Sequence, residues 1–259
     1  MKPFILLSVV VGIGGGVIAG PVPANDPSIV GWATGYQDLI RGPIDISNPD
    51  GDLASFGDPN DVIGPSGADG GVHPVVSLGD GGSIVLTFAN LITNGPGADF
   101  AVFENSHSTF YELAFVEVSS DGLNFVRFDA VSLTQTDTQI APFGTLNPAD
   151  ITNLAGKDLA GYGTPFDLEE LAGAPGLNVN AVTHVRIIDV VGSIDPAYAR
   201  TDSLGNIIND PWKTDFVEGN GGFDLDAVGV IHAIPEPSVL FLLFVGMGLV
   251  IRHAHRNRS

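Results

Sequence analysis

The chain of 259 residues contains no cysteine and carries a net charge of −20, from 30 acidic and 10 basic residues. The lack of cysteine excludes disulfide bonds, thiolate metal sites and a cysteine nucleophile. The scarcity of Lys and Arg argues against a nucleic-acid partner, because phosphate binding requires clustered basic residues. With 34 glycines, 18 prolines and only 15% charged residues, the composition is typical of a turn-rich, strand-rich protein.

Residues 1–24 have the layout of a secretory signal peptide. Lys2 supplies a positive start, and the apolar run 4–11 leads into a Gly-rich stretch. The sequence Val-Pro-Ala that ends at Ala24 is an acceptable cleavage site, and Ala19 is an alternative. We therefore expect an apolar helical segment that is removed on export. An uncleaved membrane anchor is the other interpretation.

Residues 25–233 are predicted to form one β-sandwich domain, for which this length is sufficient. Several segments alternate between apolar and polar residues with period two, as half-buried strands do. These segments are 83–88, 99–104, 113–118, 124–128, 182–190 and 223–231. Asp121 and Gly122 predict a hairpin turn between the third and the fourth. Short strands separated by Gly, Pro, Asp and Asn favour an all-β, jelly-roll-like sandwich.

Two short helices are expected in the loops of this domain. Asn147 and Thr164 each stand directly before a proline. A cap residue followed by proline is typical of a helix that begins at the proline. The sequence therefore predicts helices that start at Pro148 and Pro165.

The end of the chain combines an apolar run with a basic tail. The run 238–251 has 14 residues, fewer than the roughly 17–25 of a comfortable helical span, although flanking residues can extend it. Arg252, Arg256 and Arg258 follow it and belong on the cytoplasmic side by the positive-inside rule. We expect a transmembrane helix here, because a buried core helix would not normally end in an arginine cluster at the chain terminus.

The sequence Pro235-Glu236-Pro237 stands before this apolar run, so that three elements follow one another within residues 234–259. Their order resembles the PEP-CTERM sorting signal of Gram-negative bacteria. The resemblance implies that an exosortase in the inner membrane recognises the tail, and that the protein is delivered to the cell surface or extracellular matrix after transient anchoring. Such a system requires an export signal, which is expected at the other end.

The middle domain carries a second resemblance, in segments 97–105, 114–122, 183–189 and 222–228. These segments resemble a group of uncharacterised bacterial cell-surface proteins, many of which bear the same tail. Their order of Val-Phe-Glu, Val-Glu-Val-Ser and a closing Leu-Asp-Ala-Val is also distantly similar to jelly-roll carbohydrate-binding modules.

Acidic residues at strand ends and in Gly-rich loops are candidates for a structural calcium site, because calcium takes six to eight oxygen ligands. Glu104, Asp224 and Asp226 lie on predicted half-buried strands, where an unpaired carboxylate is costly to bury. Strict alternation places Asp224 and Asp226 on the face of Val228 and Val230, opposite to Phe223, Leu225 and Ala227. The residues of a second candidate, an acidic loop, are Asp50, Asp52, Asp58 and Asp61. All of these residues could equally cap turns.

The sequence contains no zinc-helix, nucleophile-elbow or phosphate-loop motif. We therefore expect a non-catalytic surface or matrix protein, with a role in adhesion or matrix building through extracellular polysaccharide. A secreted polysaccharide-acting hydrolase is the alternative, since two carboxylates suffice for that chemistry and no sequence spacing excludes them. A purely structural matrix component is the third interpretation.

Overall fold

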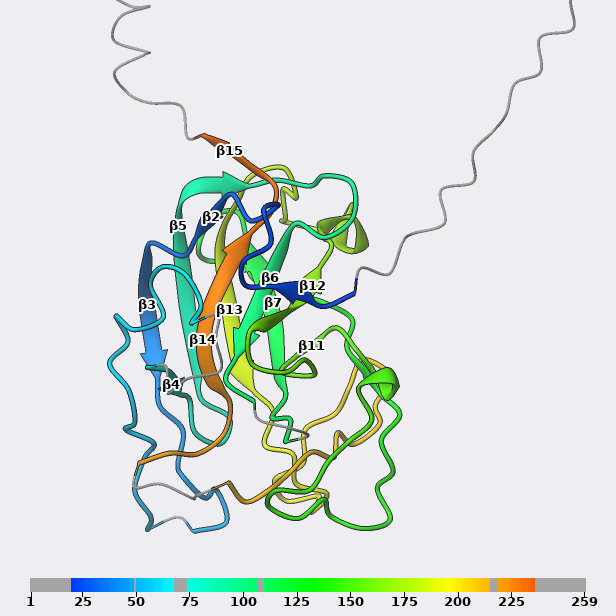
Figure 1. Ribbon diagram of the computed structural model, residues 1–259. Helices are drawn as coiled ribbons and strands as arrows, with labels where there is room; N and C mark the ends of the chain where they lie inside the picture. Colours follow the sequence, from blue (N-terminus) through cyan, green and yellow to red (C-terminus); the bar gives the residue numbers. More distant parts are fainter. Residues whose placement is uncertain (1–19, 49, 68–73, 107–109, 215–218, 236–259) are drawn as a thin grey trace, which may run out of the picture.

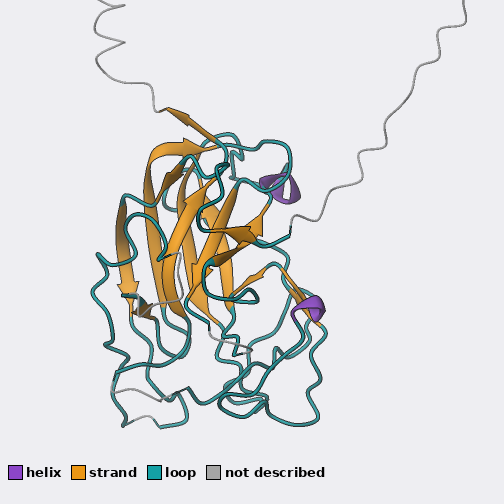
Figure 2. Ribbon diagram, in the orientation of Figure 1, coloured by secondary structure: helices purple, strands orange, loops and turns teal. Residues whose placement is uncertain are grey.

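The structure, a computed structural model, describes residues 20–48, 50–67, 74–106, 110–214 and 219–235. Two antiparallel sheets lie face to face, and the regular structure is nearly all β (Figures 1 and 2). The predicted all-β, sandwich-like class is therefore confirmed. The apolar helical segments predicted at the two ends lie outside the described residues. Within the described ranges, no helix is long and apolar enough to cross a bilayer.

The first sheet has six strands, in the order β1 (Val22–Pro23), β12 (Tyr162–Phe166), β6 (Phe100–Glu104), β14 (Asp224–Val230) and β2 (Gly31–Trp32), with β4 (Val76–Ser77) also paired to β14. The second has seven, in the order β11 (Leu154–Ala155), β7 (Ala114–Ser119), β13 (Val182–Asp189), β5 (Ser83–Ile92) and β15 (Ala233–Pro235), with β3 (Gly35–Ile40) on β5 and β8 (Val126–Arg127) on β7. A separate ribbon joins β9 (Val131–Ser132) to β10 (Ile151–Thr152).

The hydrophobic core fills the space between the two sheets. At its centre Phe100 of β6 stacks on Phe166 of β12, with ring centroids 5.3 Å apart, and meets the edge of Phe128 beside β8. All three rings are at most 1% exposed. Burial of each contributes on the order of 1.5–3 kcal/mol before entropy is counted, so a core of this size stabilises the domain without disulfides.

The period-two segments predicted from the sequence correspond to β5, β6, β7, β8, β13 and β14. The hairpin predicted at Asp121 and Gly122 is also confirmed, because β7 and β8 pair across it. Gly122 has φ 74°, which favours glycine. The Asp121 carboxylate accepts hydrogen bonds from the backbone N–H groups of Leu123 and Asn124, each at 2.8 Å, and so closes the turn.

One of the two predicted helices begins where expected. A 3₁₀ turn spans Pro148–Asp150, and the Asn147 side chain accepts from the Ala149 N–H. The second prediction was wrong by three residues: Thr164 and Pro165 belong to β12, where they pair with β6. The 3₁₀ turn starts only at Leu168, with Asp167 as its N-cap. Strand pairing thus overrides the local cap-and-proline signal.

Strict alternation along 223–231 was also wrong. The pairing of β14 with β6 shifts between Leu225 and Ala227, which is the mark of a β-bulge. As a result Leu225 packs in the same inter-sheet core as Val228 and Val230, whereas Ala227 packs with Phe103 on the outer side. The extra residue in β14 therefore reverses the face of the sheet on which each later side chain of the strand lies.

The two sheets extend beyond the predicted domain bounds at both ends. β1 includes Val22 and Pro23, within the predicted signal peptide, and β15 includes Pro235 of the predicted sorting motif. β15 pairs with the far end of β5 and lies at one end of the sandwich (Figure 1). The long loops gather at the opposite end, which we name the loop end (Figure 2).

Candidate functional site

Six acidic side chains from separate segments are buried at the loop end, each at most 5% exposed. We name this group the carboxylate cluster; its members are Asp80, Glu104, Glu112, Asp189, Asp210 and Asp224. The antiparallel topology explains why they meet. β6 and β13 end at the loop end, where Glu104 and Asp189 are their last residues, while β5, β7 and β14 begin there.

Asp189 connects the two sheets. It ends β13 of the second sheet, and its Oδ2 accepts a hydrogen bond from the Gly81 N–H while its Oδ1 accepts from the Phe223 N–H, both at 2.7 Å. Phe223 directly precedes β14 of the first sheet. Burial, followed by the charge of Asp80, raises the pKa of Asp189 to about 8. This carboxyl therefore retains its proton at neutral pH.

Asp80, which lies beside Asp189, accepts hydrogen bonds from a different part of the loop end. Its Oδ2 accepts from the Ile46 N–H at 2.8 Å and from the indole Nε1 of Trp212 at 3.0 Å. Burial raises its pKa to about 6 in spite of these bonds, with the charge of Asp45 acting in the same direction. Two facing carboxyls cannot both ionise cheaply in such surroundings, so Asp80 and Asp189 form a proton-holding pair.

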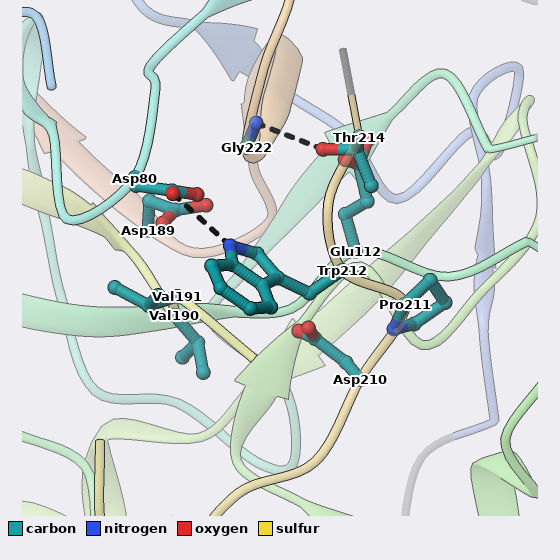
Figure 3. A pocket seen from close by; sticks show the side chains of 10 residues that line it. All are labelled: Asp80, Glu112, Asp189, Val190, Val191, Asp210, Pro211, Trp212, Thr214 and Gly222. Carbon is teal, nitrogen blue, oxygen red and sulfur yellow. Dashed lines mark hydrogen bonds between the residues drawn. The ribbon is translucent and has the colours of Figure 1, made fainter. Parts of the chain in front are cut away.

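Trp212 occupies the middle of the pocket that this pair lines (Figure 3). The Asp80 and Asp189 carboxyls lie at one side of its indole ring, and Glu112 lies with Thr214 at the other. Asp210 lies below, and its Oδ2 accepts from the Leu113 N–H at 3.0 Å. Burial first, and then neighbouring carboxylates, raise the pKa of both Glu112 and Asp210 well above their ordinary values.

The sequence-predicted residues Glu104, Asp224 and Asp226 are brought close enough to influence one another. Burial, followed by the charge of Asp224 and more weakly that of Asp226, raises the pKa of Glu104 well above its ordinary value. Asp224 accepts hydrogen bonds from the Ser77 hydroxyl and from Asn220 Nδ2, the latter at 3.2 Å, and burial raises its pKa to about 6.

Two carboxylate oxygens of the cluster stand out because they are buried and find no hydrogen-bond partner among the described residues. They are Oε1 of Glu104 and Oε1 of Glu112. The other oxygen of Glu104 accepts from the Ser106 N–H at 2.9 Å. Leaving a buried polar atom without a hydrogen-bond partner costs about 1–3 kcal/mol. Each of these two oxygens would therefore be stabilised by a bound proton or by a cation.

Three basic side chains act on the cluster. Arg41 lowers the pKa of Asp224, Lys213 that of Asp80, and Arg200 that of Asp189, but each is a minor influence beside burial. Arg41 donates mainly to backbone carbonyls, among them those of Phe56 and Gly57 at 2.8 Å. The cluster therefore remains short of positive charge.

The acidic loop predicted as a second calcium site uses its side chains locally. Asp58 Oδ1 accepts from the N–H and side-chain amide of Asn60, and Asp61 Oδ2 accepts from the Asp58 N–H at 3.1 Å. Asp50 and Asp52 are exposed. Within the described part of the chain, no group of three or more acidic or histidine side chains converges as a ready-made metal site. Calcium binding stays a prediction at both places.

The pocket at Trp212 is too small for a sugar-processing cleft in this conformation. Its space, including the part open to solvent, is about 170 Å³, whereas ligand pockets usually measure roughly 300–1,000 Å³. The chemistry that the cluster supports directly is the retention of protons by buried carboxyls.

Sequence reasoning missed Asp80, Glu112, Asp189 and Asp210 as members of one site. A signal for three of them was present, because Asp80 and Glu112 precede the predicted strands 83–88 and 113–118, and Asp189 lies near the end of the predicted strand 182–190. Antiparallel neighbours bring the start of one strand to the end of the next. Of the residues predicted to form a sorting signal, Pro235 lies in β15, whereas Glu236, Pro237, Arg252, Arg256 and Arg258 lie outside the described residues. In comparisons with known proteins, no family model, no curated protein and no solved structure matches the chain.

Proposed function

We propose that the protein is an exported, exosortase-sorted component of the bacterial cell surface or extracellular matrix, with a non-catalytic role in adhesion or matrix building. The observation that carries the proposal is the position of the sorting motif. Pro235 pairs with Asn90 at the edge of the second sheet, so the first residue of Pro235-Glu236-Pro237 belongs to the last described strand. The apolar run and the arginines follow at once.

The spacing supports delivery from a membrane. Glu236 and Pro237 alone separate β15 from the apolar run that begins at Ser238. A chain extends by at most about 3.3–3.6 Å per residue, so the folded domain would stand within roughly 10 Å of the membrane before processing. A sorting enzyme embedded there would find the motif directly beneath the sheet edge.

The interaction with extracellular polysaccharide belongs to the same proposal, as does the jelly-roll arrangement of the two sheets. Long loops gather at the end away from β15 (Figure 1), and an acidic domain favours neutral ligands or ligands bridged by cations over phosphate-bearing ones. Binding of the purified domain on a glycan array supports adhesion. A domain that assembles into matrix without binding any glycan is a structural component instead.

Substitution of Glu236 and Pro237 by alanine is expected to stop sorting while leaving the fold intact, because neither residue is needed for β15. In a Gram-negative host that has an exosortase, the wild type should reach the surface or medium without its tail, as intact mass shows. The double variant should accumulate in the inner membrane with the tail attached. Asp137→Ala, which removes an exposed acidic residue of the domain, serves as the control. Equal sorting of all three proteins would refute the proposal.

We further propose structural calcium at the side of the cluster formed by Glu104, Glu112 and Asp224, with Asp226 nearby. The partnerless oxygens of Glu104 and Glu112 support it, since buried carboxylates need a proton or a cation. Some rearrangement of the cluster would accompany binding, because no three acidic side chains of the described residues are placed to hold an ion in the present conformation.

Calcium added after chelation is expected to raise the unfolding temperature by about 5–10 °C at a concentration near 100 times the dissociation constant. Glu104→Gln and Glu112→Gln should abolish most of this response, since each removes a charge without changing shape. Asp50→Asn, in the exposed second loop, should respond like the wild type. An unchanged unfolding temperature together with no calcium in elemental analysis contradicts the site.

A further inference from the structure

We infer that the exported chain is cut after Ala19, so that Gly20 becomes the mature N-terminus and strand β1 stays in the folded domain. The inference rests on the proposed export. The sequence alone does not decide the position, because residues 17–19 and 22–24 both present valine followed two residues later by alanine, the small-residue pattern of a cleavage site. The fold distinguishes them.

Cleavage after Ala24 would remove a strand of the first sheet. Val22 and Pro23 pair antiparallel with Gly163 and Tyr162 of β12. The Ala24 N–H continues this ladder by donating to the Gly161 carbonyl at 2.9 Å. Without these residues, β12 would become the edge of the sheet (Figure 1). An open edge is a template for unwanted pairing with other chains.

Val22 also closes a small core on the outer side of the first sheet. It is 8% exposed and packs in one cluster with Ala101, Phe103 and Ala227. Phe103 and Ala101 are fully buried although they face away from the inter-sheet core. Their burial depends on β1 together with the nearby Trp32, whose ring centroid lies 5.4 Å from that of Phe103. Removal of residues 20–24 would expose this face.

The residues just after Ala19 contribute less to the fold than those around Ala24. Gly20 and Pro21 are exposed, and no heavy atom lies within 4 Å of a Cβ built on Gly20. Residues around Ala24 are instead bound into the fold: Asp26 N–H donates to the Pro23 carbonyl at 2.9 Å. A cut after Ala24 would therefore remove residues that the fold uses, whereas a cut before Gly20 keeps them.

The test is the N-terminal residue of the full-length protein after secretion by a Gram-negative host. Wild type and Ala24→Gln should both begin at Gly20, whereas Ala19→Gln should accumulate as precursor, because glutamine is too large for the position before the cut. A wild-type chain that begins at Asn25 overturns the inference but leaves export standing. A chain that keeps Met1 overturns export as well.

Thermal unfolding of the secreted protein provides a second test. If β1 stays, Val22→Ala in the secreted protein should lower the unfolding temperature by about 3–6 °C, because a buried side chain is truncated. Val30→Ala, at a residue that is 62% exposed, should leave it unchanged. If residue 22 has been removed, both variants unfold like the wild type, and the inference fails.

Discussion

The free energy of unfolding is expected to fall by about 4 kcal/mol or more as the pH rises from 5 to 8 in a chelating buffer. Burial raises the pKa of Asp189 to about 8, and those of Asp80 and Asp224 to about 6, from an unfolded value of 3.8. The native state therefore binds more protons than the unfolded state throughout this interval. A difference of one bound proton changes the free energy of unfolding by about 1.36 kcal/mol per pH unit. Over three pH units, Asp189 alone therefore accounts for about 4 kcal/mol.

The sign of this effect is fixed by the direction of the shifts. Stability from a raised carboxyl pKa is fully present below about pH 4 and is lost as the pH rises through the folded value. Hydrogen bonds lower the pKa of Asp26 and Asp58, so part of the stability is lost again in strong acid. We expect a maximum near pH 4–5, measured by urea unfolding at a series of pH values. A curve that is flat, or that rises toward pH 8, contradicts the protonated cluster.

Asp189→Ala is expected to be the most damaging single substitution at the loop end. At pH 5 it should cost about 2–5 kcal/mol, because it leaves the partly buried N–H group of Gly81 and the buried N–H group of Phe223 without acceptors. The loss should shrink toward pH 9, since the wild type by then carries an ionised carboxylate at the same place. Urea unfolding of the wild type and the variant at both pH values measures how this loss of stability changes with pH.

Asp189→Asn provides the matched comparison. The amide has the shape of a protonated carboxyl and keeps one acceptor oxygen, so it should cost less than alanine at pH 5 and reduce the pH dependence. Asp137→Ala, which alters an exposed residue, should follow the wild type throughout. Parallel pH profiles for the wild type and Asp189→Asn would show that Asp189 is not the titrating group.

The fold class could be predicted from local patterns, because half-buried strands such as 83–88 and 182–190 carry their alternation in the sequence. The hairpin at Asp121 and Gly122 was predictable for the same reason: two residues suffice to specify it. The bulge in β14 was not, because a register shift depends on the partner strand β6. Likewise, Thr164 became a strand residue only because it pairs with Val102.

The site was less accessible to sequence reasoning than the fold. Glu104, Asp224 and Asp226 could be singled out as acidic residues on apolar strands. Asp80 and Asp189 lie 109 residues apart, and their proximity follows from the pairing of β13 with β5. No pattern within one segment contains that information.

The location of β15 would give the domain a defined end toward the membrane in the anchored state proposed above. Its partner β5 has ten residues, so it spans roughly 33 Å from the edge that holds Pro235 to the opposite extremity. If the chain is tethered through its C-terminus as proposed, the end that holds β15 would lie nearest the bilayer. The carboxylates and their surrounding loops would then lie at the far end, where ions and neighbouring polymers of a cell envelope would reach them first.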